Sequence, residues 1–275
     1  MRGLEIIART ISRPTPRGSS ELPWQYHPRS DHHSKVACWA ILFDLLNTCE
    51  LLAKHVEEGR VAFGINHEMH DFKQNKTKAL DLVLCTPGTT AGQRKSTNFT
   101  RLREEYSIVL DEGDLEALAE LPDLRIAPVG SVLCALEAKA CMTEHKKAES
   151  RFFDELNSSH QTVHGASDIC IAAGFVMINM AAKFRSPTRA EGVVHKQPEV
   201  TRSVMHRVQQ LPRRTKVGES GFDALAIAVV DCENDPRRSV RIVTEDPAPQ
   251  LGDGFHYDSM IRRVAQLYDS RFPRD

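Results

Sequence analysis

The sequence predicts an α/β protein, because segments with the periodicity of helices alternate with short apolar segments that suit buried strands. The strongest helical pattern covers residues 35–58, where apolar side chains recur every three or four positions until Gly59 ends the helix. The strongest strand patterns are residues 79–85 and 131–142. The 275 residues are 41% hydrophobic and 27% charged, which is ordinary globular composition for a chain that can bury a sizeable core.

The remaining elements follow from the same two periods. Residues 172–181 read as a buried strand, with a helix as the competing interpretation. Further strands are expected at 60–66, 222–232 and 240–245, and further helices at 114–122, 143–160, 198–211 and 258–268. Asp114 and Thr143 are the expected N-caps of their helices, and Pro198 opens its own.

The domain organisation is expected to be simple. Residues 1–34 are rich in Arg, Ser, Pro and His with weak periodicity, so they predict a loosely packed N-terminal extension. One domain is expected over residues 35–275. It contains a turn-rich, basic insertion at about 86–128 and a basic helical segment at about 183–217.

Charge and cysteine usage indicate the compartment. The formal net charge is −1, so any basic surface must be local. Seven scattered cysteines without a CxxC pair favour reduced thiols. No apolar run approaches the roughly 20 residues that span a bilayer, and we see no secretory signal. We therefore expect a cytoplasmic protein that does not contact a membrane.

Four charged residues occupy positions that should be apolar. Glu137 and Lys139 lie two apart on the 131–142 strand, so they share a face, although both faces of that strand are otherwise apolar. Asp81 lies within the 79–85 strand, where aspartate is depleted. Glu50 falls inside the apolar stripe of the 35–58 helix. Burying such charges costs several kcal/mol unless they are paired or bind a cation.

A divalent cation would explain this pattern. Clustered carboxylates repel one another unless a hard cation lies between them, and Mg²⁺ takes one or two protein carboxylates and keeps its other positions for water and phosphate oxygens. A lysine beside the metal can orient a water molecule and stabilise developing negative charge. These groups together suit the hydrolysis of a phosphodiester bond.

The order of Glu50, Asp81 in LDLVL, and Glu137 and Lys139 in LEAK resembles the PD-(D/E)XK nuclease superfamily, which has the restriction-endonuclease-like fold. The resemblance covers about residues 36–182. It implies a three-layer core, in which helices flank a mixed central β-sheet and the motif residues lie on two adjacent strands.

The resemblance also implies roles for these residues. Asp81 and Glu137 ligate Mg²⁺, Lys139 positions or activates the attacking water, and Glu50 assists as a third acid and metal ligand. Mn²⁺ is expected to substitute for Mg²⁺. Two departures stand out: Leu80 replaces the motif proline, and 137 − 81 = 56 residues separate the two acids, so the insertion must loop out.

Less specific interpretations remain open at this stage. Glu137 and Lys139 could form a cross-strand ion pair on a solvated face, Asp81 could cap a turn, and Glu50 could pair with Lys54. A zinc site is also conceivable and would use Cys134, Cys141 and His145. Structural zinc normally needs four ligands in a recognisable spacing, so buried thiols are the better interpretation of those cysteines.

Basic residues in the insertion and in the late helical segment are candidate nucleic-acid contacts. Such residues usually form a solvated surface, but beside a phosphodiesterase site they can hold phosphates without reading sequence. The candidates are Arg94, Lys95, Arg101, Arg103, Arg207, Arg213 and Arg214.

These observations predict a Mg²⁺-dependent DNA endonuclease that resembles a type II restriction enzyme or a nuclease effector of antiviral defence. Cutting a duplex generally needs two active sites, so we expect a homodimer, and a partner protein in a defence system is possible. Two alternatives remain. One is a nucleic-acid- or partner-binding module that has the fold without the chemistry, and the other is a metal-dependent phosphoesterase acting on small nucleotides.

Overall fold

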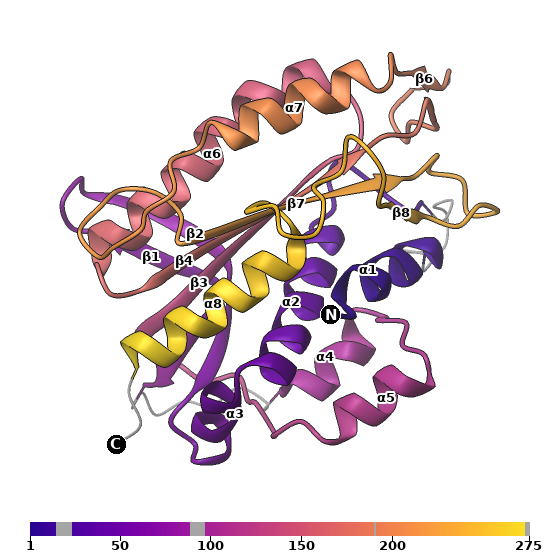
Figure 1. Ribbon diagram of the computed structural model, residues 1–275. Coiled ribbons are helices and arrows are strands. Elements are labelled where there is room, and N and C mark those ends of the chain that lie inside the picture. The colour runs from indigo at the N-terminus through magenta and orange to yellow at the C-terminus, as the bar shows by residue number, and fades with distance from the viewer. Residues whose placement is uncertain (15–23, 89–96, 190, 273–275) are drawn as a thin grey trace.

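A mixed β-sheet of six strands forms the middle layer of the molecule, with helices on both faces (Figure 1). The computed structural model describes residues 1–14, 24–88, 97–189 and 191–272. The strands, in spatial order, are β1 (Ala62–Asp71), β2 (Lys76–Pro87), β3 (Val129–Cys141), β4 (Ile171–Asn179), β7 (Ala224–Asp231) and β8 (Arg241–Val243). Strands β3, β4 and β7 are mutually parallel, whereas β1, β2 and β8 pair antiparallel to their neighbours. The predicted α/β class and the mixed sheet between helices are confirmed.

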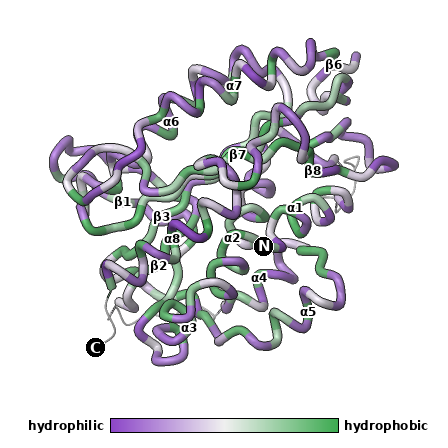
Figure 2. The backbone as a smooth tube through the Cα atoms, in the orientation of Figure 1, coloured by the Kyte–Doolittle hydropathy of each residue, from purple (hydrophilic) through white to green (hydrophobic). Residues whose placement is uncertain are grey.

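Two hydrophobic cores separate the sheet from its helical layers. On one face lie α6 (His145–Ala166) and α7 (Glu199–Gln209), and on the other lie α2 (His32–Thr48) and α8 (Tyr257–Arg271). The central strands carry apolar side chains on both faces, as expected of a sheet covered on both sides. In Figure 2 these strands are mostly green, while α6 and α7 mix green and purple, as half-exposed helices do.

The strand predictions are confirmed. Residues expected to be extended because of alternating or continuous apolar character all lie in strands or overlap them. Strand β4 settles the one ambiguous segment: all nine of its residues are buried, and it hydrogen-bonds to a strand on each side. A short pair of strands, β5 (Lys183–Phe184) and β6 (Val193–Val194), forms a separate hairpin within the expected basic segment.

The N-terminal residues are not a loose extension, so that prediction is wrong for the part of residues 1–34 that the structure describes. Helix α1 (Gly3–Ser12) packs against α2 and the edge strand β8. Ile6, Ile7 and Ile11 are fully or almost fully buried. Their spacing is that of an amphipathic helix, which flanking arginines and prolines obscured in the sequence. Gln25 is also buried and donates a hydrogen bond to the carbonyl of Arg238.

The expected continuous helix over residues 35–58 is two helices. Helix α2 ends at Thr48, Cys49 is extended, and α3 (Glu50–Glu57) begins after a bend of 97°. Asn47 and Thr48 are weak helix formers, and the bend lets the buried Leu51 and Leu52 of α3 pack near α8. No single helix in the described ranges is long and apolar enough to cross a membrane, although α2 and α3 taken together pass by length and composition.

The insertion between β2 and β3 folds onto α2. Its helices are α4 (Phe99–Glu105) and α5 (Glu112–Ala119). The Trp39 ring of α2 stacks on Phe99 at 4.6 Å between centroids, and its Nε1 donates to the Phe99 carbonyl. The N-cap of α5 is Asp111 and not Asp114. Asp114 is the third helical residue, whose side chain completes the capping box.

The start of α6 also differs from the prediction. Thr143 does not cap the helix, because Glu144 holds the N-cap position in a left-handed conformation with φ of 51°. The hydroxyl of Thr143 instead lies 3.1 Å from Nε2 of His195. A non-glycine residue in this backbone region costs energy, and such residues gather at functional sites.

We expect the cysteines to resist thiol reagents in the folded protein. All seven are buried free thiols. Burial raises the pKa of Cys49 and Cys85 to about 11 and that of Cys134, Cys141 and Cys232 to about 12, so the reactive thiolate is scarce. Titration with a chromogenic disulfide should label no cysteine before unfolding and all seven afterwards. Rapid labelling of the native protein would contradict this.

Candidate active site

The candidate site lies where two strands of the sheet diverge. The ladder between β2 and β3 runs as far as Leu82 opposite Leu136. Beyond that pair β2 stays with β1, and β3 stays with β4. Asp81, which precedes Leu82 in the chain, is the first β2 residue beyond this last pair. Its Oδ2 accepts a hydrogen bond of 2.8 Å from the backbone N–H of Ala138. The fork therefore brings Asp81 next to the strand that carries Glu137 and Lys139.

Glu137 is the most deeply buried charged group of the fork, with 3% of its surface exposed. Its Oε1 lies 2.6 Å from Nζ of Lys139 and 3.9 Å from Nζ of Lys78. Its Oε2 is buried and has no hydrogen-bond partner among the residues that the structure describes. Burial raises the pKa of Glu137, and the nearby Lys139 only partly offsets this. A buried carboxylate oxygen without a donor is costly unless a cation or water reaches it.

Asp81 is held by groups on both sides of the fork. Burial raises the pKa of Asp81, while the Ala138 N–H, the Lys139 ammonium and the hydroxyl of Ser34 act in the opposite direction. Ser34 is in the first turn of α2, so this helix contributes to the site through its N-terminal end. Burial raises the pKa of the Cys38 thiol, and the charges of Asp81 and Glu137 raise it further. Both acids therefore act on the same side chain of α2.

Two lysines neighbour the same Glu137 oxygen and differ in their surroundings. Lys139 Nζ also lies 3.7 Å from Oε2 of Glu155 on α6. Burial disfavours its ammonium form, but the Glu137 charge outweighs this and the pKa of Lys139 is raised. Lys78 Nζ donates to the Glu155 carbonyl at 2.7 Å, and burial lowers the pKa of Lys78. Lys139 is thus a firmly charged ammonium at the centre of the fork.

Four further residues surround this centre without having been predicted: His33, Ser34, Lys78 and Glu155. His33 has its pKa lowered to about 4, first by burial and next by the charge of Lys139. Residues 33 and 34 fell within the supposed N-terminal extension, so they were not considered. Lys78, near the start of β2, and Glu155, in the middle of α6, carried no local signal, because charged residues on strands and helices are usually solvated.

Glu50 does not join this cluster, and its predicted place in the apolar stripe is wrong. It is exposed at the first position of α3. Ser34 touches Asp81 from the start of α2, and Glu50 follows the far end of that helix, so about 21 Å of helix separates them. The predicted place of Glu50 in the apolar stripe requires a straight helix over residues 35–58. The bend at Cys49 turns Glu50 outward.

The side chains of the fork fit a magnesium ion better than a zinc ion. Within the described ranges no group of three or more His, Cys, Asp or Glu side chains is arranged to hold a metal, which leaves Cys134, Cys141 and His145 without a common site. Mg²⁺ needs only one or two protein carboxylates. Asp81 and Glu137 supply two, and the unpartnered Oε2 of Glu137 is a free ligand atom.

The predicted phosphate contacts are distributed over several surfaces. Arg94 and Lys95 lie outside the described residues. Arg101 and Arg103 on α4 are each 3.8 Å from a glutamate, Glu105 and Glu104 respectively. The guanidinium groups of Arg207 and Arg213 lie over the rings of Phe153 and Phe255, at 3.9 Å and 4.3 Å from their centroids.

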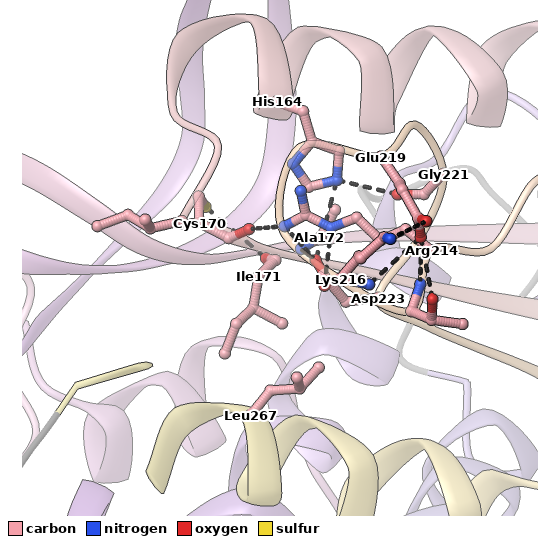
Figure 3. Close-up of polar contacts among 12 residues, drawn as sticks. His164, Cys170, Ile171, Ala172, Arg214, Lys216, Glu219, Gly221, Asp223 and Leu267 are labelled. Atoms are coloured by element: carbon pink, nitrogen blue, oxygen red, sulfur yellow. Dashed lines mark hydrogen bonds and ion pairs between the residues drawn. The ribbon is translucent and has the colours of Figure 1, made fainter. Parts of the chain in front are cut away.

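Arg214 is not a surface cation, so its predicted role is wrong. Its side chain is fully buried and its Nε donates to Oδ1 of Asp223 at 2.8 Å (Figure 3). It also donates to the carbonyl of Cys170, and Arg271 of α8 reaches the same Asp223 carboxylate at 2.5 Å. The sequence shows a run of basic residues but does not reveal that one of them turns inward.

The fold and the fork together define an α/β protein in which a buried glutamate and a lysine form an ion pair, with a partly buried aspartate beside them, at diverging strands of a mixed sheet. No family model, no curated protein and no solved structure matches this chain.

Proposed function

We propose that the protein is a Mg²⁺-dependent DNA endonuclease with the restriction-endonuclease-like fold, which hydrolyses phosphodiester bonds. The observation that carries the proposal is the buried, unpartnered Oε2 of Glu137, located at the strand fork beside Asp81 and Lys139. A mixed sheet between helical layers, with the acids on two adjacent strands, agrees with the architecture that the resemblance implies.

Each residue of the fork has a defined task in this proposal. Asp81 and Glu137 would hold the metal, which when bound polarises the phosphate and acidifies a water molecule. The Lys139 ammonium donates hydrogen bonds to the attacking water or to a phosphate oxygen, and its fixed charge stabilises the negative charge that develops there. Although burial disfavours the ammonium form, the Glu137 charge raises the pKa of Lys139, which favours the protonated donor. Glu155 limits where the ammonium can swing.

The proposed enzyme should cut DNA only with a divalent cation. We expect plasmid and linear DNA to be cleaved in Mg²⁺ or Mn²⁺ and to stay intact in EDTA, because the metal is the Lewis acid that polarises the phosphate. Gel electrophoresis over time measures this. Glu137→Gln should abolish cleavage, since it removes the charge but keeps the size of the side chain. Glu116→Gln, an exposed acid on α5, is the matched control and should leave the rate unchanged.

Other outcomes of the same assay would replace the proposal. Affinity for DNA without cleavage in any metal would identify a binding module on this fold. Hydrolysis confined to mononucleotides or cyclic nucleotides would identify a small-nucleotide phosphoesterase. A homodimer and a partner protein in antiviral defence belong to the proposal as predictions, and sedimentation of the protein with and without DNA tests the first of them.

A further inference from the structure

A cavity of about 330 Å³ adjoins the candidate active site. Its walls come from four parts of the chain: the segment before α2, the end of β3, the first turns of α6, and residues 186–189 with Val193. The side chains that matter here are Tyr26, Lys147, Arg151, Arg189 and Glu144.

The cavity lies beside the fork and is linked to it by a chain of contacts. Ala140, which lines the cavity, follows Lys139 on β3, and the two side chains point to opposite faces of the strand. Arg151 lies 3.4 Å from Glu155, and Glu155 lies 3.7 Å from Lys139. On the other side, the Tyr26 ring is 5.2 Å from the ring of His33, which senses the Lys139 charge. The Arg151 side of the cavity is therefore two ion pairs away from Lys139.

The charges around the cavity suit a polyanion. Three cations face one acid, and the side chains of Lys147, Arg151 and Arg189 are 77%, 66% and 55% exposed. Glu144 pairs with Arg189 and, at 3.0 Å, with Lys147. Ion pairs this exposed are weak, so a phosphate can exchange for the carboxylate. The left-handed Glu144 thus holds two cations over the cavity.

An aromatic ring, that of Tyr26, is fixed in another part of the cavity wall. The Tyr26 N–H donates to Oδ1 of Asn234 at 2.8 Å, and Nδ2 of Asn234 donates back to the Tyr26 carbonyl at 3.1 Å. Asn234 is fully buried. The Tyr26 ring also meets Phe184 edge to face at 6.3 Å. A basic groove with a pre-positioned aromatic ring is how proteins bind single-stranded nucleic acids.

The size of the cavity selects between single and double strands. Its volume is near the lower end of the roughly 300–1,000 Å³ typical of small-ligand sites. A space of this size holds about one nucleotide. A base-paired duplex does not fit, because every base pair brings two nucleotides.

We propose that this cavity binds an unpaired nucleotide next to the scissile phosphate, so that the preferred substrate is a single-stranded nucleic acid. Lys147, Arg151 and Arg189 contact phosphates, and a base stacks on Tyr26. The cleavage part of this inference rests on the proposed function, whereas strand binding does not. Cutting a single strand needs one active site, so a dimer is not required for it.

Fluorescence anisotropy with a short end-labelled oligodeoxynucleotide in EDTA measures binding without cleavage. We expect the single strand to bind at least tenfold tighter than the matching duplex. Lys147→Gln combined with Arg189→Gln should weaken single-strand binding about tenfold and reduce the slope of log affinity against log salt by about 1.4, because two phosphate contacts are lost. Arg262→Gln on α8, on the opposite side of the sheet, is the matched control and should change nothing.

Tyr26 provides an independent test. Tyr26→Leu should weaken single-strand binding about tenfold through loss of stacking, whereas Tyr26→Phe should bind normally. Equal affinity for duplex and single strand, or normal binding by both the double variant and Tyr26→Leu, would overturn the inference. Absence of cleavage in every metal would instead overturn the proposed function and leave the binding result standing. A parallel oligoribonucleotide shows whether the cavity takes DNA or RNA.

Discussion

Replacing Lys139 with methionine is expected to slow metal-dependent DNA cleavage about 10³-fold, because the variant loses a donor aimed at the charge that develops during phosphodiester hydrolysis. Methionine keeps the length and the apolar stem of the side chain. The Lys139 ammonium lies within the fork, 2.6 Å from Glu137 and 3.7 Å from Glu155. Single-turnover cleavage of a labelled DNA measures the effect.

Lys78→Met is the matched control for this prediction. Lys78 neighbours the same Glu137 oxygen at 3.9 Å, but its Nζ is held by the Glu155 carbonyl. If positive charge near Glu137 were all that mattered, both variants would lose activity equally. We expect a much smaller loss in Lys78→Met. Equal losses in the two variants, with unchanged thermal unfolding, would remove Lys139 from its assigned role.

Asp223→Asn is expected to destabilise the protein by about 3–5 kcal/mol, the usual cost of breaking a buried ion pair by removing one partner. The side chains of Asp223 and Arg214 are fully buried and form an ion pair (Figure 3). Arg271 ties α8 to the same carboxylate. Neutralising the acid leaves two guanidinium groups without a counterion. Thermal unfolding followed by circular dichroism should show a melting temperature lower by roughly 10 °C.

The same network sets an acid limit on stability. Burial alone would raise the pKa of Asp223, but hydrogen bonds from Arg214 and Arg271 outweigh it, so the pKa is lowered. The stability that the ionised Asp223 contributes is therefore complete above the pKa of an unfolded aspartate, about 3.9. It is lost as the pH falls through the lower pKa of the folded protein. In Asp223→Asn this part of the acid dependence should disappear. Asp246→Asn, which removes an exposed pair with Arg202, is the control and should hardly change stability. Equal stability of the two variants would contradict the prediction.

Local sequence patterns predicted most of the sheet. Alternating or continuous apolar runs predict strands, and the parallel central strands are apolar on both faces because helices cover both faces of the sheet. Helix α1 was missed because ten residues, flanked by Arg2 and Arg13, make a short pattern. The break at Cys49 was missed because the apolar period continues through it, and only packing against α8 requires the bend.

The site was predictable where burial and charge conflict. Glu137, Lys139 and Asp81 stand out in apolar strands, so a single sequence draws attention to them. The roles of His33 and Glu155 depend on contacts between elements far apart in the chain, which no local pattern records. The same limit explains the errors over Glu50 and Arg214. One was placed by assuming a straight helix, and the other by assuming that a basic run faces water.

The fork between β2 and β3 has a consequence for the backbone as well as for the chemistry. Diverging strands leave main-chain N–H groups unsatisfied, and here the carboxylate of Asp81 takes the place of the missing strand by accepting from Ala138. One side chain thus serves as a rung of the ladder and as a prospective metal ligand. The carboxylate of Asp81 is thereby tied to the integrity of the sheet, because it supplies the acceptor for the Ala138 N–H where β2 has left β3.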